Sequence, residues 1–167
     1  MTDIKLFEFG PTRSARCRWT LLEAGLDFES FDKGAETVRA PELAAVHPIP
    51  KVPAATFDGK APFESAAIST YIADLVPEKK LIGPSGTWAP ALHDQWTAYV
   101  LTEMEAWLWS TVLNIGILPE AQRIDAVHEQ NAGLFNAAPA VWRRRWPMPT
   151  TWSITVSPSP TSLPATP

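Results

Sequence analysis

The stretch from residue 47 to residue 75 (HPIPKVPAATFDGKAPFESAAISTYIADL) constrains the fold more than any other part of the chain. Its prolines lead into a short apolar run at residues 54–57. Asp58-Gly59 is a strong signal for a tight turn, and residues 61–63 resume an extended pattern. The stretch therefore predicts a β-hairpin.

A helix is expected directly after the hairpin. Apolar residues recur there at helical spacing, at Ala67, Ile68, Tyr71, Ile72 and Leu75. Ser65 precedes them and is expected to be the N-cap. The hairpin and the helix together end one structural unit.

Three features of this stretch suit a small peptide. A cis bond between Val52 and Pro53 would turn the Val52 N–H and C=O outward, where an extended ligand can pair as an added strand. Ser65 lies at a helix N-terminus, which favours a carboxylate. Glu64 can accept hydrogen bonds from an ammonium group. These properties predict a ligand with a peptide backbone and an amino-acid end.

A V-P pair, a hairpin and then E-S-x-A-I-x-x-Y-I resemble the glutathione-binding half of cytosolic glutathione S-transferases. The resemblance covers residues 3–90 well and the rest in outline. It implies that Val52, before a cis-Pro53, pairs with the cysteinyl backbone of glutathione, and that Glu64 and Ser65 hold the γ-glutamyl end. Lys51 would meet a glutathione carboxylate, although a solvated surface lysine is the ordinary alternative.

The composition is that of an ordinary soluble chain. It has 167 residues, 46% hydrophobic and 19% charged, with a formal net charge of −4. A basic stripe that could bind nucleic acid is not found before residue 142, and we expect neither a signal peptide nor a membrane span. With one cysteine and three scattered histidines, the chain is expected to be cytoplasmic and to hold no metal.

The first 76 residues predict a thioredoxin-like α/β domain. Alternation and strand formers indicate strands, and apolar spacing with Gly and Pro boundaries indicates helices. The expected strands lie at 4–9, 26–31 and in the hairpin, and the expected helices at 14–24, 41–46 and 65–75. Their order, β-α-β-α-β-β-α, is that of the thioredoxin-like fold. A C-x-x-C motif is absent, so disulfide exchange is not expected.

The second half predicts an incomplete all-helical domain. A linker rich in Pro and Gly is expected at 77–90, followed by a helical domain over 91–139. Its apolar spacing predicts one long amphipathic helix at 92–115 and a second at 119–136. The resemblance implies a homodimer.

Residues 140–167 form a Pro/Ser/Thr-rich segment without a sustained period. One hypothesis is that it is read out of frame and that the helical domain is truncated there. Codons for it can be chosen so that a neighbouring frame encodes a helical pattern with a capping box. The alternative is a natural disordered tail.

Glutathione chemistry needs a thiolate, and the loop after the first strand is where the family places the activating hydroxyl. A free thiol has a pKa of about 8.5, so a hydroxyl donor must stabilise the anion. Alignment on the following arginines places this role on Thr12, with Ser14 second. Either hydroxyl could instead cap the helix. Cys17 is an alternative nucleophile, but its place inside the helix favours a buried apolar role.

The electrophile pocket implied by the resemblance has five candidate residues, Phe9, Trp96, Tyr99, Met104 and Trp107. Aromatic residues at helical spacing are more often part of a core, so this second interpretation stays open.

The resemblance predicts a glutathione transferase that conjugates glutathione, its co-substrate, to a small hydrophobic electrophile without a bound cofactor. One alternative is a glutathione-binding module without turnover. Another is a glutathione-dependent reductase or isomerase.

Overall fold

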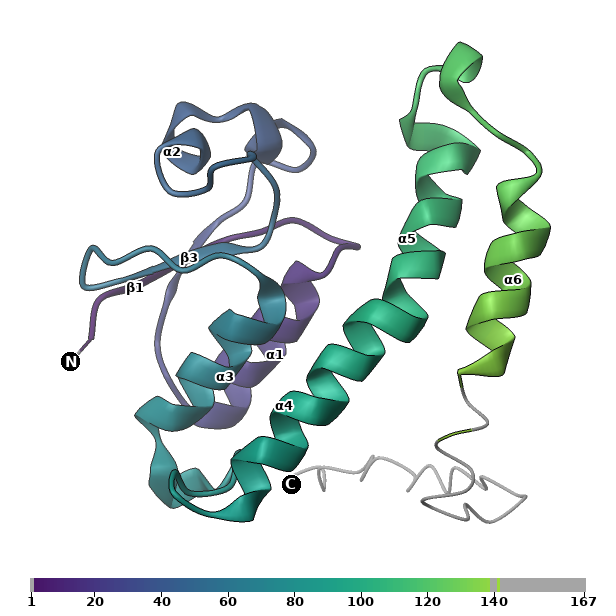
Figure 1. Cartoon of the computed structure of the whole chain (residues 1–167). Coiled ribbons are helices and arrows are strands. Elements are labelled where there is room, and N and C mark those ends of the chain that lie inside the picture. Colours follow the sequence, from purple (N-terminus) through teal and green to yellow (C-terminus); the bar gives the residue numbers. More distant parts are fainter. Residues whose placement is uncertain (1, 139–140, 142–167) are drawn as a thin grey trace, which may run out of the picture. The chain divides into compact units, whose positions relative to one another are not determined.

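The computed structural model of the chain describes residues 2–138 and 141. It contains two compact units, one over Met1–Tyr99 and a second that begins at Val100 (Figure 1). The segment 140–167, for which the sequence suggests a frameshift or a natural tail, lies outside the described residues except for Val141. In the described part, no helix is both long and apolar enough to cross a bilayer.

The first unit is built on a three-stranded mixed sheet of β1 (Ile4–Phe7), β2 (Glu29–Phe31) and β3 (Ala54–Phe57). The strand order is β2-β1-β3, with β1 parallel to β2 and antiparallel to β3. Leu6 lies opposite Ser30 on one side and Ala55 on the other. Together with the helices on its two faces, this sheet confirms the expected thioredoxin-like α/β fold.

The hairpin forms, but its second arm is not a regular strand. It pairs with β3 through bridges at Ala54–Phe63 and Phe57–Lys60. Asp58 and Gly59 have φ of 49° and 78°, as a two-residue turn of type I′ requires. Pro62 accepts a hydrogen bond from the Ala55 N–H at 3.2 Å but has no N–H to return. This missing donor interrupts the ladder.

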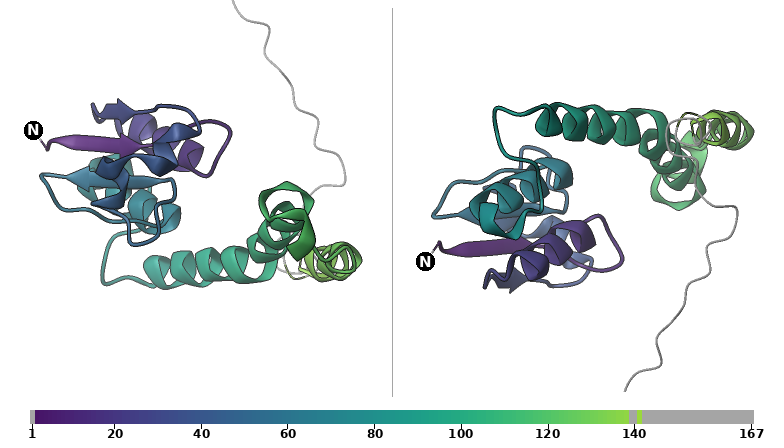
Figure 2. Two further views of the ribbon diagram at one scale, coloured as in Figure 1. Left: turned by 90° about the horizontal axis from the view of Figure 1, so that it is seen from above. Right: turned by 90° about the horizontal axis from the view of Figure 1, so that it is seen from below.

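Helices cover both faces of the sheet, as the labels in Figure 1 show. The α-helices of this unit are α1 (Ser14–Ala24), α2 (Pro41–Ala44), α3 (Ser65–Leu75) and α4 (Trp88–Val100), with 3-10 turns η1 (Glu36–Arg39) and η2 (Pro77–Lys79). The same elements are seen from above and below in Figure 2.

The core has two parts. On one face, α1 and α3 pack on β1 and β3 through fully buried side chains that include Leu6, Leu21, Ile68 and Ile72. On the other face, Leu43 of α2 packs with Phe7 and Ala54. Alternate residues of β1 therefore face opposite layers, as the period of a strand requires.

Several expected boundaries are wrong, although the element types are right. The first strand ends at Phe7 instead of residue 9, the second begins at Glu29 instead of 26, and α2 ends at Ala44 instead of 46. The helical run of the second half begins at Trp88, before the expected 92. His93 in α4 is held to α3 by a 3.0 Å contact between Nε2 and the Thr70 hydroxyl. This long-range contact was not visible in the local pattern.

The second unit is helical in its described part. Two π-helical segments, η3 (Leu101–Glu105) and η4 (Leu113–Ile117), flank α5 (Ala106–Val112), and η5 (Glu120–Gln122) leads to α6 (Val127–Ala137). The helix expected from residue 119 starts later because Ile124 N–H donates to Asn114 Oδ1 at 2.8 Å and holds the connection. Between α6 and α5, Asn131 Nδ2 donates to Thr111 Oγ1 at 3.1 Å.

Gly25 ends α1 in a left-handed conformation with φ of 70°. Its N–H and that of Leu26 donate to the carbonyls of Leu22 and Leu21, each at 3.1 Å, as in a Schellman motif. A Cβ on Gly25 would meet the Lys79 Nζ at an ordinary 3.6 Å, so Gly25→Ala meets no serious clash. We expect a loss of about 1 kcal/mol in unfolding free energy, due to the backbone alone, measured by urea denaturation.

The matched control is Gly133→Ala within α6, where the backbone is helical and a Cβ would meet nothing within 4 Å. This change should stabilise the protein by about 0.5–1 kcal/mol. A loss of stability at Gly133 equal to that at Gly25 would contradict the conformational explanation.

Candidate functional site

The edge before β3 offers an unpaired backbone. The Val52–Pro53 peptide is cis, as the sequence predicted. The Val52 side chain packs beside the Phe7, Leu43 and Ala54 cluster. Within residues 2–138 and 141, the backbone N–H and C=O of Val52 have no hydrogen-bond partner. An extended ligand can therefore pair with both groups.

The N-terminus of α3 differs in detail from the expectation. Ser65 is not the N-cap but the first helical residue, and Glu64 takes the N-cap place without a side-chain cap bond. Ser65 is only 4% exposed, and its Oγ accepts a hydrogen bond from Arg16 Nη1 at 3.4 Å. The first amides of any helix have no intrahelical acceptor, and here they lie beside a guanidinium. Arg16 thus adds positive charge to a place that already suits a carboxylate.

Glu64 has an unusual backbone, with φ of 72° and ψ of 118°. A residue with a side chain pays about 1–3 kcal/mol for such a conformation, and strained residues concentrate at binding sites. Its carbonyl accepts the Ile68 N–H at 3.0 Å, and its carboxylate is exposed. The bend therefore leaves the Glu64 carboxylate exposed at the start of α3.

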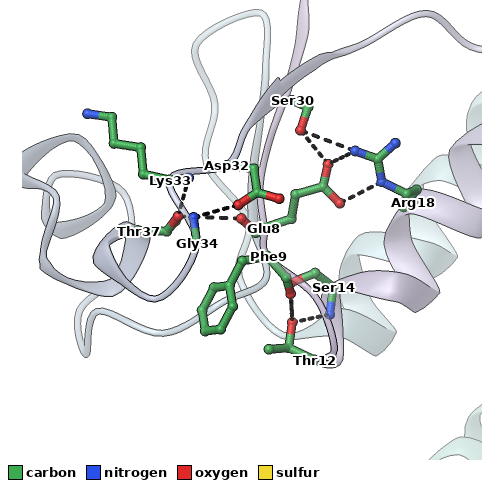
Figure 3. Close-up of polar contacts among 10 residues, drawn as sticks. All are labelled: Glu8, Phe9, Thr12, Ser14, Arg18, Ser30, Asp32, Lys33, Gly34 and Thr37. Atoms are coloured by element: carbon green, nitrogen blue, oxygen red, sulfur yellow. Dashed lines mark hydrogen bonds and ion pairs between the residues drawn. The ribbon is translucent and has the colours of Figure 1, made fainter.

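Thr12 and Ser14 form one hydrogen-bonded chain in the loop between β1 and α1 (Figure 3). The Thr12 hydroxyl donates to the Phe9 carbonyl at 2.5 Å. Because that uses the only Thr12 proton, the 2.8 Å contact with Ser14 Oγ has Ser14 as the donor. The Ser14 N–H also donates to Thr12 Oγ1, at 3.3 Å. The Thr12 oxygen therefore has its donor and both acceptor positions in use.

This chain limits what the two hydroxyls can do. Ser14 is 1% exposed, whereas Thr12 is half-buried and nearer the surface. The N-cap position of α1 is held by Arg13, whose side chain makes no cap bond, while the Thr12 hydroxyl accepts from the N–H of Ser14, the first helical residue. For Thr12 to donate to a ligand sulfur, its hydroxyl has to turn away from the Phe9 carbonyl.

Cys17 is buried, in agreement with the apolar role considered from the sequence. It is 0% exposed, and its Sγ lies 3.6 Å from the Ser65 carbonyl oxygen and 3.9 Å from Ser69 Oγ. Burial raises the pKa of the thiol to about 11. Cys17 therefore holds its proton near pH 7, which favours the buried apolar role over that of a nucleophile.

The loop before Val52 carries two basic groups of different kinds. Lys51 is exposed. His47 is buried. Its backbone N–H donates to the Leu43 carbonyl at 2.9 Å, and its ring Nδ1 accepts a hydrogen bond from the Ile49 N–H at 3.1 Å. Burial lowers the pKa of His47, so the ring is a neutral structural group. Across the described residues, His, Cys, Asp and Glu form no group suited to a metal ion.

The five residues considered for an electrophile pocket come from both units. Phe9, Trp96 and Tyr99 belong to the first unit, and Met104 and Trp107 to the second. All five are half-buried. Trp96 and Tyr99 meet edge to face, with ring centroids 5.7 Å apart. Their grouping into one pocket stays a prediction.

Residues 2–74 match the family model described as the glutathione S-transferase N-terminal domain. Over these residues, the first domain is similar to the glutathione S-transferase family. The resemblance seen in the sequence is thereby confirmed.

Solved structures agree with this assignment. A glutathione transferase from Methylococcus capsulatus is 29% identical, with a TM-score of 0.66 over 85% of this chain and 68% of that one. The beta-etherase LigF from Sphingobium is 22% identical, with a TM-score of 0.70 over 84% of this chain and 72% of that one. The transferase URE2P6 from Phanerochaete chrysosporium is 19% identical, with a TM-score of 0.73 over 86% of this chain and 67% of that one. These last two show the fold alone.

The chain spans about two thirds of the length of the similar structures, and only 61% of a tau class transferase from mango. Among curated proteins, none matched the chain.

Cys17 should make the family domain sensitive to alkaline pH. Its folded pKa of about 11 lies above the ordinary 9.0, so the unfolded thiol ionises first and the folded state loses stability as pH rises from 9 to 11. Wild-type protein should lose up to about 1.4 kcal/mol per pH unit relative to Cys17→Ala across that window, and nothing below it. Urea denaturation at several pH values measures the difference, and parallel stability curves would contradict it.

Proposed function

We propose that this chain is a glutathione transferase, which binds glutathione and activates its thiol for conjugation to an apolar electrophile. The observation that carries the proposal is the Val52 backbone beside a cis-Pro53, which has no hydrogen-bond partner among the described residues, in a domain that matches the transferase family model. A theta class relative from Xanthomonas axonopodis, 22% identical, was solved with glutathione bound. At this identity the likeness supports the fold alone, so the proposed chemistry rests on the residues of this chain.

Glutathione would be held along its whole length. The Val52 N–H and C=O pair with the cysteinyl backbone. The γ-glutamyl carboxylate lies at the start of α3, against the Ser65 hydroxyl, the first helix amides and the Arg16 guanidinium, which already contacts Ser65. The exposed Glu64 carboxylate accepts from the γ-glutamyl ammonium, and Lys51 meets the other carboxylate.

The reaction requires the loss of one proton and one leaving group. The glutathione thiol gives its proton to solvent, and Thr12 donates a hydrogen bond to the resulting thiolate after turning from Phe9. The sulfur lone pair then forms a bond to an electrophilic carbon, for example in a chlorinated nitrobenzene, and chloride leaves with the bonding pair. The domain supplies orientation and stabilisation of the anion, and Ser14 is the second candidate for the donor.

A second candidate function is glutathione binding without turnover. Two observations favour it: the Thr12 hydroxyl is saturated by Phe9 and Ser14, and the chain spans about two thirds of its structural relatives. Glutathione-dependent reduction or isomerisation is a third candidate, and product analysis separates it from conjugation. We also propose that the chain forms a homodimer and is cytoplasmic. The domain limits 1–76, 77–90 and 91–139 and the five-residue electrophile pocket are proposals as well.

Thr12 is tested by two substitutions. Thr12→Val keeps the shape but removes the hydroxyl, so the bound thiol should ionise less readily and conjugation at pH 7 should fall about tenfold, as for a rise of one unit in thiol pKa. Thr12→Ser keeps the hydroxyl and should stay within about threefold of wild type. Conjugation of a chlorinated nitrobenzene measures both rates. Normal turnover of Thr12→Val, with loss of turnover in Ser14→Ala, would assign the role to Ser14.

Ser65 is tested by titration calorimetry with glutathione. Ser65→Ala removes a hydrogen bond to a charged group, worth about 1.5–3 kcal/mol, so glutathione should bind at least about tenfold more weakly. Ser69→Ala, one turn along the same helix, is the matched control and should leave the affinity unchanged. Failure of the wild-type chain to bind glutathione would contradict the proposed function.

A further inference from the structure

Glu8 is a buried carboxylate that the proposed chemistry does not use. It is 4% exposed and follows directly after β1. Its two carboxylate oxygens receive Arg18 in a bidentate ion pair, with Nε 2.8 Å from Oε2 and Nη2 on Oε1. Ser30 Oγ donates to the same Oε1 at 2.6 Å (Figure 3). A buried charge needs such partners, and here they come from α1 and β2.

The backbone of Glu8 is held as firmly as its side chain. Its N–H donates to the Phe31 carbonyl at 3.1 Å, and its carbonyl accepts from Thr37 Oγ1 at 3.5 Å. Arg18 is fixed from its own side, since Nη2 also contacts Ser30 Oγ at 3.2 Å and the guanidinium lies over the Phe28 ring at 5.3 Å. The pair is therefore a rigid tie between two elements.

The tie closes the loop that carries the candidate catalytic hydroxyl. Glu8 lies at the start of this loop, and Arg18 lies in the helix that begins at Ser14, where the loop ends. The residue after Glu8 is Phe9, whose carbonyl accepts the Thr12 hydroxyl, and Thr12 in turn accepts from Ser14. A shift of Glu8 relative to α1 would thus move both ends of the hydroxyl chain.

A bidentate arginine–carboxylate pair fixes geometry more strictly than apolar contacts do. The neighbouring core is apolar, with Leu6 and Leu21 fully buried, and such side chains would fill the space without orienting the loop. Asp32 is the further charged group near Arg18, and its Oδ1 is occupied by the Gly34 N–H at 2.7 Å. The hydrogen bonds that Arg18 donates to the Glu8 carboxylate raise the pKa of Arg18, which stays charged at every relevant pH.

We propose that Glu8 and Arg18 are positioning residues that hold the Phe9 carbonyl and the Thr12 hydroxyl in register for stabilisation of the glutathione thiolate. The inference rests on the proposed function for its catalytic part. Its structural part, the clamping of residues 9–14, is independent of any ligand.

The direction of a pKa change distinguishes positioning from simple electrostatics. Glu8→Gln removes a negative charge and leaves Arg18 less compensated, which by Coulomb's law alone would lower the pKa of a nearby thiol. Loss of positioning acts in the opposite direction, because the thiolate loses its hydroxyl donor. A rise in the thiol pKa therefore requires the positioning role.

The experiment compares Glu8→Gln with Glu29→Gln on the full chain. Glu29 forms an exposed ion pair with Lys5 at 2.9 Å, next to Ser30 in β2, so its loss controls for breaking an ion pair on the same sheet. The pH dependence of kcat/KM for a chlorinated nitrobenzene and the calorimetric affinity for glutathione are measured for each protein. Glu8→Gln should raise the apparent thiol pKa by about one unit. The value of kcat/KM should therefore fall about tenfold near neutral pH and change little at high pH, and the affinity for glutathione should stay within about threefold of wild type. Glu29→Gln should match wild type.

Amide hydrogen exchange in the ligand-free protein gives the second measurement. Glu8→Gln should speed exchange at Ser14 and Ala15 at least about tenfold and leave the interior of α3 unchanged. If wild-type protein neither binds nor conjugates glutathione, the proposed function fails. Amide hydrogen exchange then tests by itself whether Glu8 and Arg18 clamp residues 9–14. An unchanged or lowered thiol pKa together with unchanged exchange would overturn the inference.

Two milder variants keep the test valid if Glu8→Gln does not fold. Ser30→Ala removes one donor to Glu8 without leaving a charge unpaired, and Arg18→Lys keeps the charge but loses the bidentate geometry. Both should raise the apparent thiol pKa in the same direction by a smaller amount. Wild-type pH profiles in both variants would overturn the inference.

Discussion

The packing of α1 and α3 side by side on one face of the sheet is the interaction on which the candidate site depends. Leu21 of α1 and Ile72 of α3 are fully buried in the same cluster as Leu6 of β1. This packing brings the beginnings of the two helices together, so that Arg16 reaches Ser65 and Cys17 lies against the Ser65 carbonyl. The candidate carboxylate-binding place at the start of α3, where Arg16 contacts Ser65, therefore depends on the packing of the core. Cys17 contributes to this packing as a small buried side chain between the two helices.

The polar side of the site shows a second constraint. The Phe9 carbonyl and Ser14 together occupy the donor and both acceptor positions of the Thr12 hydroxyl. This hydroxyl is available to a sulfur only after a local exchange of hydrogen bonds. By contrast, the Val52 backbone has no partner to give up within the described chain. Pairing an extended ligand at Val52 and freeing the Thr12 hydroxyl thus have different structural requirements in this domain.

Much of the first unit could be predicted from the sequence because its signals are local. Val52-Pro53 and Asp58-Gly59 each restrict the backbone by themselves, and both appear with the expected conformation. The errors lie where distant residues decide. Ser65 was expected as N-cap, yet Glu64 occupies that place with a positive φ that no propensity favours for glutamate. The contribution of Arg16 and the clamp between Glu8 and Arg18 depend on contacts across the fold.

The sequence by itself determined the order of strands and helices, the turn at residues 58 and 59, and the resemblance of the first domain to a family. Periodicity and the conformational limits of proline and glycine act over a few residues, so these signals are local. Only the tertiary structure decided which polar groups are already paired and which are open to a ligand. Hydrogen-bond partners such as Glu8 and Ser30 are far apart along the chain. Burial, which raises the pKa of Cys17 and encloses the Glu8 carboxylate, exists only once the layers have packed.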